Sequence, residues 1–153
     1  MYKKTLLEER IRKHYASSGV TVPPDINIER FAKACKIKVL CKPMPARYDI
    51  FKGYKGIVLD SRCNKKEKKE QFFRTLYYII YNKGHQTALL ESERQLLQEK
   101  ARRFKMYLTL PYFLLKEYNI YDPCITKILS EDFCVTEELC MFRIKNIINK
   151  TIK

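Results

Sequence analysis

The residues best able to bind a metal or to act as nucleophiles are few and widely spaced. The chain of 153 residues has two histidines, His14 and His85, and six cysteines. No two of these residues lie three or four positions apart, so no single helix can present two such ligands on one face. A cysteine nucleophile would also need a histidine close to it in space. The sequence therefore predicts no helical metal site, no cysteine nucleophile and no cofactor.

Basic side chains form the second group of candidate functional residues. The chain has 31 lysines and arginines against 17 aspartates and glutamates, which gives a formal net charge of +14. Such a charge favours approach to nucleic acid, anionic lipid or an acidic protein, although it does not specify a fold. The densest stretches also contain or follow glutamates, so the alternative of solvated helix faces stays open. Candidate contacts for nucleic acid or an acidic partner are Lys65, Lys66, Lys68, Lys69, Arg102, Arg103 and Lys105.

The composition is typical of a single globular domain. Hydrophobic residues make up 46% of the chain, which is enough for one core, and no apolar run approaches the roughly 20 residues that a membrane span needs. Glu8 and Glu9 follow the first basic residues before any long apolar stretch, so the N-terminus does not resemble a secretory signal. We therefore expect one domain over residues 1–153, located in the cytoplasm and without a membrane partner.

The first half of the chain predicts two short helices and a small sheet. Apolar residues recur at helical spacing over Leu6–Tyr15. Asn27 can cap a second helix, because its side-chain oxygen can accept a hydrogen bond from a free first-turn amide. Apolar and β-branched residues predict three strands, at Lys36–Cys41, Tyr48–Phe51 and Tyr54–Asp60. We expect these strands to form an antiparallel meander.

The second half of the chain predicts helices. One begins near Lys65, is apolar almost all round and should be central and buried, with Gly84 placed to end it. Ser92, with a glutamine three residues later, forms a capping box for the next helix, which ends near Leu108. The signals for the last two helices are Asp122–Pro123 and Thr136. The predicted fold class is α+β and mainly helical, with residues 112–153 as a C-terminal helical segment.

Three stretches share their order and spacing with one known family. They are Gly53–Asp60; Glu99–Pro111, with Ala101, Phe104 and Pro111 at the family's spacing; and Ile128–Ile144, in which Val135-Thr136 precedes the triplet Phe142-Arg143-Ile144. Together they resemble the ImmA/IrrE family of phage and mobile-element regulators, whose founding members are zinc metallopeptidases. The resemblance spans nearly the whole chain. It implies a zincin-like pair of long helices behind the strands.

The peptidase motif of that family is degenerate in this chain. Family peptidases carry Thr-Leu-x-His-Glu-x-x-His on the first long helix, where two histidines bind zinc and the glutamate is the general base. A carboxylate from the second helix completes the ligand set. The alignment after Thr75-Leu76 places Tyr78 and Asn82 at the histidine positions, Ile79 at the base position and Gln98 at the carboxylate position. The resemblance therefore implies a pseudoenzyme with no catalytic residue.

A shifted alignment matches Gly84-His85 to the Gly-His pair of the family. It places Tyr81, Asn82 and His85 at the three positions and so recovers one ligand. However, Asn82 cannot accept a proton as a carboxylate does. On either alignment the motif lacks its general base.

Two interpretations of these positions stay open. In the first, the side chains refill the space of a lost metal site and belong to the core. Alternatively, the polar groups of Tyr78, Asn82 and Gln98 line a pocket that binds something. The further candidates for a pocket or a partner contact are Tyr81, His85 and Glu99.

Three functions are compatible with the sequence. The leading hypothesis is a metal-free regulatory protein that binds a protein partner, as an antirepressor or other partner of a helix-turn-helix repressor. The resemblance implies such a partner, because peptidases of the family recognise these repressors and cleave or inactivate them. The second is a basic nucleic-acid-binding protein. The sequence contains no recognised nucleic-acid motif, which counts against this hypothesis. The third is a divergent zinc peptidase with ligands gathered from separate elements, such as His85, Glu99 and a cysteine.

Overall fold

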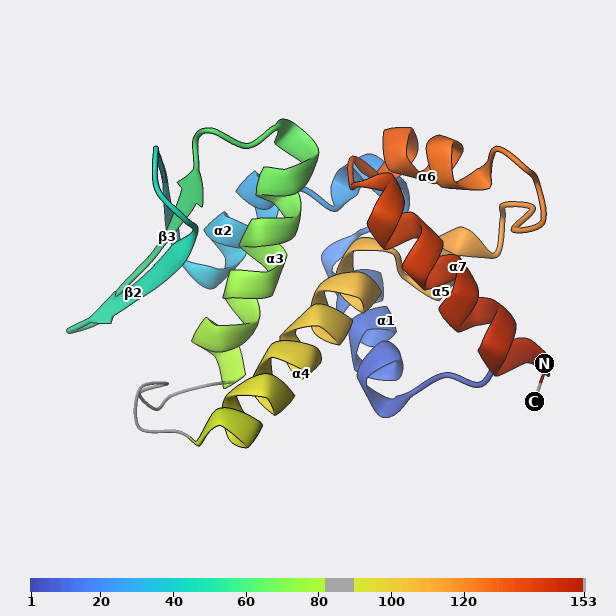
Figure 1. Cartoon of the computed structure of the whole chain (residues 1–153), viewed down its shortest axis with the longest axis horizontal. Helices are drawn as coiled ribbons and strands as arrows, with labels where there is room; N and C mark the ends of the chain where they lie inside the picture. Colours follow the sequence, from blue (N-terminus) through green and yellow to red (C-terminus); the bar gives the residue numbers. More distant parts are fainter. Residues whose placement is uncertain (82–89, 153) are drawn as a thin grey trace. The chain divides into compact units, whose positions relative to one another are not determined.

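The structure is a computed structural model that describes residues 1–81 and 90–152, except for the side chain of Ile152. Its described elements are mixed α and β and mainly helical, which confirms the predicted fold class. In chain order they are α1 (Leu6–Ser18), the 3-10 turn η1 (Pro23–Asp25), α2 (Ile28–Cys35), β1 (Lys38–Lys42), β2 (Arg47–Phe51), β3 (Tyr54–Asp60), α3 (Lys65–Tyr81), α4 (Glu91–Thr109), α5 (Tyr112–Leu115), α6 (Ile125–Phe133) and α7 (Glu137–Ile152) (Figure 1).

The chain divides into two compact units. Unit 1 consists of Met1–Ile26 and Met106–Lys153, and unit 2 consists of Asn27–Lys105. The helical segment 112–153 predicted from the sequence belongs to unit 1. Unit 2 contains the sheet, α2, α3 and most of α4, and therefore most of the residues that the sequence marks as candidates.

The sheet is mixed, so the prediction of an antiparallel meander is wrong. The strand order is β1-β3-β2, with β1 parallel and β2 antiparallel to β3. The residues of β3 from Gly56 to Asp60 are all buried, whereas β1 and β2 are largely exposed. A strand buried on both faces belongs at the centre of a sheet. The connection over residues 43–46, with Pro43 and Pro45, takes the chain from one edge to the other, and prolines cannot extend a ladder.

A tight turn joins β2 to β3. Lys52 and Gly53 both have positive φ, at 45° and 83°, and Phe51 pairs with Tyr54 across the turn. This is the backbone of a two-residue hairpin, in which both central residues are left-handed. The turn fixes the register that places β3 against α3.

Helix α3 packs against the sheet in unit 2 and supplies much of its core (Figure 1). Phe72, Phe73 and Leu76 are almost fully buried, and the ring of Phe73 meets that of Phe31 on α2 edge to face, with centroids 4.9 Å apart. The end of the helix is more exposed than predicted. Ile80 and Tyr81 are 41% and 50% exposed, so the helix is not buried all round.

Three predicted helix starts are confirmed by their capping hydrogen bonds. The Asn27 side chain accepts from the Arg30 amide at 2.9 Å, and the Thr136 hydroxyl accepts from the Leu139 amide at 3.3 Å. At the start of α3, Asn64 and Glu67 bond reciprocally, at 2.9 and 3.0 Å. Each side chain satisfies an amide that the helix itself leaves without a partner.

Two predicted helix starts are wrong by a few residues. Ser92 lies inside α4, because the Arg94 amide already donates to the Leu90 carbonyl. The negative charges of the glutamates beside Ser92 interact favourably with the positive N-terminal end of the helix dipole, so they stabilise a helix that begins before Ser92. Asp122 and Pro123 form a turn instead, in which the Asp122 carboxylate accepts from the Cys124 amide at 2.8 Å, and α6 begins at Ile125.

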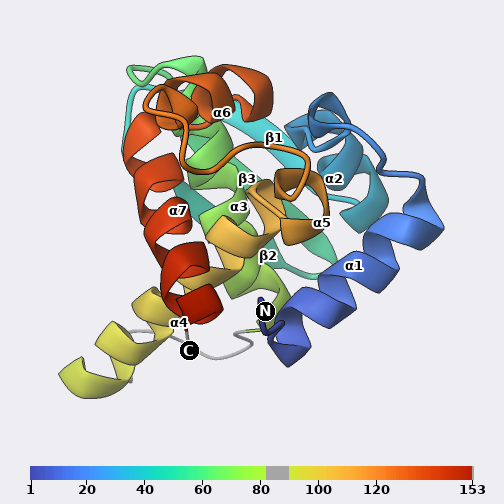
Figure 2. The ribbon, with the colours of Figure 1, turned by 90° about the vertical axis from the view of Figure 1, so that its right-hand side faces the viewer.

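Unit 1 is held by α1, the end of α4 and the last helices. Helices α6 and α7 pack together (Figure 2), with Leu129 and Phe133 fully buried. The Tyr15 hydroxyl of α1 donates to the Leu108 carbonyl at 2.6 Å. No helix within residues 1–81 and 90–152 combines the length and the apolar character that a membrane crossing needs.

Candidate functional site

Two residues at positions where the family resemblance implies metal ligands line one groove. Tyr78 on α3 and Gln98 on α4 both line a groove of about 620 Å³ in unit 2. Its described lining comes from β2, the residue before β2, and the two long helices. The lining residues are Ala46, Arg47, Tyr48, Arg74, Thr75, Tyr78, Gln98, Arg102 and Lys105.

The groove is positively charged. Three arginines and one lysine line it, and no carboxylate occurs among its described lining residues. Two of the cations pair with carboxylates that do not line the groove. Asp49 pairs with Arg47 and Glu70 pairs with Lys105, in both cases with 3.4 Å between nitrogen and oxygen. The groove therefore presents guanidinium, ammonium, hydroxyl and amide groups, which suit an anion.

Burial and neighbouring charges both affect the pKa of Lys105. Its side chain is only 16% exposed, and that of Glu70 is 13% exposed. Burial lowers the pKa of Lys105, Glu70 opposes this effect, and the charges of Arg74 and Arg102 lower the pKa further. The direction of the pKa shift shows that burial and like-charge repulsion outweigh the ion pair.

Two tyrosine rings form one wall of the groove. The rings of Tyr48 and Tyr78 are nearly parallel, at 11°, with centroids 6.0 Å apart. Burial raises the pKa of Tyr78, while the nearby charge of Arg74 partly opposes this effect. Both tyrosines are half-buried, so each ring has packed and exposed parts.

The other candidate positions do not line the groove. Ile79 is 8% exposed and belongs to the core, as the core interpretation predicts for that position. Tyr81 is half exposed and packs its ring near those of Tyr77 and Phe104, at 5.1 and 5.6 Å. Glu99 is exposed and lies 4.0 Å from Arg103 in an ion pair. Asn82 and His85 lie outside the described residues.

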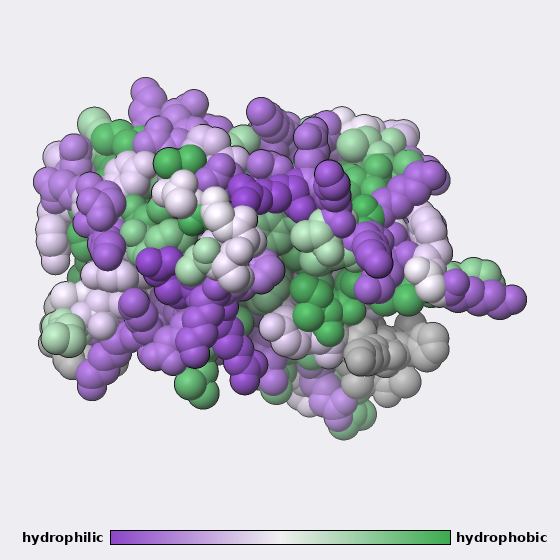
Figure 3. Space-filling view, turned by 180° about the vertical axis from the view of Figure 1, so that it is seen from behind, coloured by the Kyte–Doolittle hydropathy of each residue, from purple (hydrophilic) through white to green (hydrophobic). Residues whose placement is uncertain are grey.

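The candidate basic residues separate into two groups. Arg102 and Lys105 line the groove, whereas Arg103 on the same helix does not. The candidates on the first turns of α3 do not line it either. Lys65 is exposed and Lys66 and Lys68 are half-buried, while Lys69 is 6% exposed. Hydrophilic side chains cover much of the face in Figure 3, between smaller hydrophobic areas.

Sequence reasoning missed five lining residues, which are Ala46, Arg47, Tyr48, Arg74 and Thr75. Arg74 and Thr75 lie four and three positions before Tyr78, just as Arg102 and Lys105, which were already candidates, lie four and seven positions after Gln98. Helical spacing alone would have put each set on one face. Arg47 and Tyr48 are brought to the groove by the sheet topology, which no local pattern shows.

The donor set of the groove does not fit zinc. Zinc in proteins takes cysteine, histidine and carboxylate ligands, and a cation is repelled by arginine and lysine. Among residues 1–81 and 90–152, no three His, Cys, Asp or Glu side chains gather as metal ligands would. The described lining of this groove therefore offers no ligand set for zinc.

A second polar cluster lies in unit 1, around Arg143. This arginine is fully buried and bonds to the Leu110 carbonyl at 2.9 Å and to Glu8 at 3.1 Å. Lys150 bonds to Glu8 at 3.2 Å and to the Tyr107 hydroxyl at 3.1 Å. The cluster is largely buried and its members are hydrogen-bonded to one another, which is typical of a structural role.

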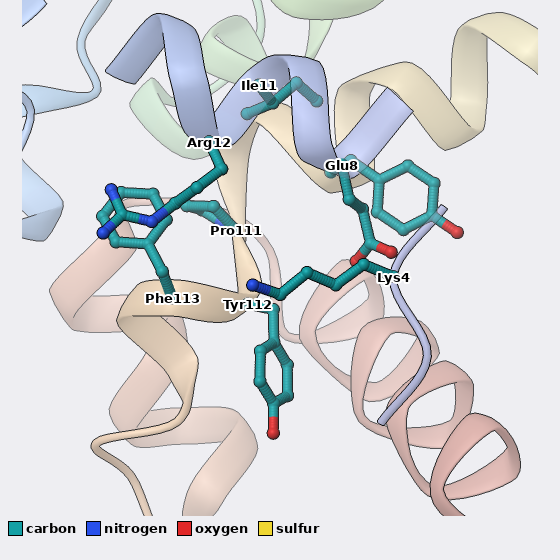
Figure 4. Close-up of a pocket in the computed structure, with 8 residues that line it drawn as sticks. Lys4, Glu8, Ile11, Arg12, Pro111, Tyr112 and Phe113 are labelled. Atoms are coloured by element: carbon teal, nitrogen blue, oxygen red, sulfur yellow. The ribbon is translucent and has the colours of Figure 1, made fainter. Parts of the chain in front are cut away.

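A small cavity of about 10 Å³ lies beside this cluster and has no room for a ligand (Figure 4). On one side the Arg12 guanidinium lies over the Phe113 ring, 4.3 Å from its centroid (Figure 4). The cavity thus reflects packing between α1 and α5, and the groove in unit 2 is the stronger candidate site.

The comparisons with known proteins relate the chain to phage-like elements. It is 25% identical over 114 residues to the phage-like element PBSX protein XkdA of Bacillus subtilis (strain 168), covering 74% of this chain and 58% of XkdA. It is 26% identical over 119 residues to the uncharacterized protein YqaB of the same strain, covering 78% of this chain and 69% of YqaB. The match thus spans less than two thirds of XkdA. No protein-family profile and no solved structure matches the chain. In sequence, the chain is similar to a protein of a phage-like element.

Proposed function

We propose that this protein is a regulatory protein of a phage-like element that acts by binding a protein, as a metal-free counterpart of the ImmA/IrrE peptidases. Its partner is a transcriptional regulator, with a helix-turn-helix repressor as the leading case. Binding that removes the repressor from DNA makes the protein an antirepressor. The similarity to XkdA supports the phage-like setting of this proposal.

One observation supports a function without peptide cleavage. Where the resemblance places zinc ligands, Tyr78 and Gln98 face a groove that also holds four cationic side chains. Ile79 occupies the position of the general base and is buried in the core. A peptidase site of this family needs a metal and a base at these positions. The groove offers neither among its described residues.

Binding alone can regulate a repressor. A ligand shifts an equilibrium only by the difference between its affinities for the two states. A preference of about 1.4 kcal/mol for the DNA-free repressor changes the ratio of DNA-free to DNA-bound repressor about tenfold. No covalent step is therefore needed.

The test combines association, operator binding and the integrity of the regulator. The protein is mixed with purified helix-turn-helix regulators of the same element, and complexes are measured by size-exclusion chromatography. We expect a complex that reduces operator DNA binding in a gel shift, with the regulator's mass unchanged after incubation with zinc. Absence of any complex contradicts the proposal. Cleavage that a chelator stops would instead support the divergent zinc peptidase.

Direct nucleic-acid binding is the second candidate function, and the four cations of the groove favour it. A gel shift with duplex and single-stranded DNA over a series of salt concentrations tests it. Affinity for phosphates should fall steeply with salt, because counterions are released on binding. Repressor displacement without any gel shift by the protein itself would favour the first function.

A further inference from the structure

The charges around the groove in unit 2 leave it with an excess of positive charge. Arg47 and Lys105 each have a carboxylate at 3.4 Å, from Asp49 and Glu70, and neither carboxylate lines the groove. Arg74 is exposed and makes no ion pair with any carboxylate in the described part of the chain. The groove thus presents more cationic than anionic groups to a ligand.

This excess favours a multiply charged anion. A single carboxylate neutralises one charge, whereas a phosphate monoester carries close to two negative charges at neutral pH. Three of the four cations are arginines, whose planar guanidinium matches two oxygens of one phosphate. Burial is the main cause of the lowered pKa of Lys105, and the charges of Arg74 and Arg102 add to it, so a bound anion would relieve that added repulsion.

The size and the aromatic wall of the groove restrict the anion further. A volume of about 620 Å³ is that of a small-molecule site and far exceeds a phosphate ion. Tyr48 and Tyr78 supply ring surface beside the cations, and Gln98 supplies an amide that can donate and accept hydrogen bonds. A planar base fits such an environment, because tyrosine rings stack on bases of any sequence.

We propose that this groove binds a nucleotide, with its phosphate held by Arg74 and Arg102 and its base placed against the ring wall of Tyr48 and Tyr78. The nucleotide is either a free mononucleotide or an unpaired residue of a nucleic-acid strand, since both present the same chemistry. Binding of a free mononucleotide goes beyond the proposed function, whereas binding of an unpaired strand residue rests on the second candidate function and names the groove residues that perform it.

Isothermal titration calorimetry of the full chain tests the inference with AMP, ATP, a ten-residue oligothymidylate, duplex DNA and inorganic phosphate as probes. We expect AMP, ATP or the single strand to bind, and to bind more tightly than inorganic phosphate. The variants Arg74→Gln and Arg102→Gln should each weaken this binding at least about tenfold. A preference for ATP and AMP identifies a free nucleotide, and binding of the single strand alone identifies a strand residue.

The matched control is Arg103→Gln. Arg103 is the neighbour of Arg102 on α4, is exposed and does not line the groove, so this variant removes the same net charge outside the site. We expect its affinity for the probes to stay within about twofold of wild type, because only screened long-range charge is lost. Thermal melts confirm that all variants fold.

Several results overturn the inference. They are binding of none of the probes, binding of duplex DNA only, inorganic phosphate binding as tightly as AMP, and equal weakening by Arg102→Gln and Arg103→Gln. The repressor assay is run on the same variants, so the two proposals fail separately. A variant that loses nucleotide binding but still forms the repressor complex would leave the proposed function intact, because the two activities then use different residues.

Discussion

The guanidinium of Arg143, near the C-terminus of the sequence, lies 3.1 Å from the Glu8 carboxylate on the first helix, and neither side chain is more than 6% exposed. Arg143 is the centre of the Phe-Arg-Ile triplet that contributes to the family resemblance. The structure shows why an arginine stands there: it also bonds to the Leu110 carbonyl and so joins three segments of unit 1. Its role is structural, whereas the candidate site lies in unit 2.

Replacing Arg143 should destabilise unit 1 strongly. The variant Arg143→Ala leaves Glu8 buried without its closest cation, and breaking a buried pair from one side costs about 3–5 kcal/mol. Urea denaturation followed by circular dichroism measures the free energy of unfolding. Arg103→Ala is the control, because its exposed ion pair contributes about 0–1 kcal/mol. Equal losses in the two variants would contradict a structural role for Arg143.

The same cluster predicts acid sensitivity. Burial raises the pKa of Glu8, but hydrogen bonds from Tyr2 and the Thr5 amide, with the charges of Arg143 and Lys150, outweigh it and lower the pKa below 4.5. A carboxyl with a lowered folded pKa stabilises the protein above its unfolded pKa, and this stabilisation is lost as the pH falls through the folded pKa. Stability should therefore decline below about pH 4.5.

Comparing wild type with Glu8→Gln isolates that contribution. The amide does not titrate, so the variant should be less stable than wild type at neutral pH and the difference should shrink as the solution is acidified. Denaturation in urea over a pH series measures both curves. If the stability curves of wild type and variant stay parallel across the whole pH series, the ionisation of Glu8 is not coupled to folding.

Local signals in the sequence were enough to predict most elements. Asn27 and Thr136 mark helix starts through bonds to amides three residues away, so their effect does not depend on the rest of the fold. The strands are placed within about two residues because their apolar and β-branched residues are also a local signal. Ser92 failed as a cap because a serine can also occupy the first turn of a helix.

Features that depend on distant packing could not be predicted in the same way. The central place of β3 follows from burial on both faces, which requires α3 and two partner strands. The groove needs that topology too, because Arg47 and Tyr48 reach it only from an edge strand. Tyr78 and Gln98 line this groove, whereas Ile79 lies in the core.

The hairpin turn offers a stabilising substitution. Lys52 has a left-handed backbone, which is unfavourable for lysine and is tolerated much better by asparagine. Lys52→Asn should therefore raise the free energy of unfolding by about 0.5–1 kcal/mol. Gly53→Ala should lower it by about 1 kcal/mol through backbone strain alone, since a Cβ there meets no atom within 4 Å. Opposite signs in urea denaturation are the expected result, and equal signs would contradict the turn geometry.

Glu70 should be the counterion that makes the cationic groove compatible with folding. Glu70→Gln leaves Lys105 largely buried, with Arg74 and Arg102 nearby, and should destabilise the protein by about 1–3 kcal/mol. Adding Lys105→Met to this variant removes the buried ammonium group that lost its ion pair with Glu70 and should recover most of the loss. A double-mutant cycle in urea measures the coupling between the two residues. Additive effects would show that the 3.4 Å pair contributes nothing, and the groove would then tolerate its cations without Glu70.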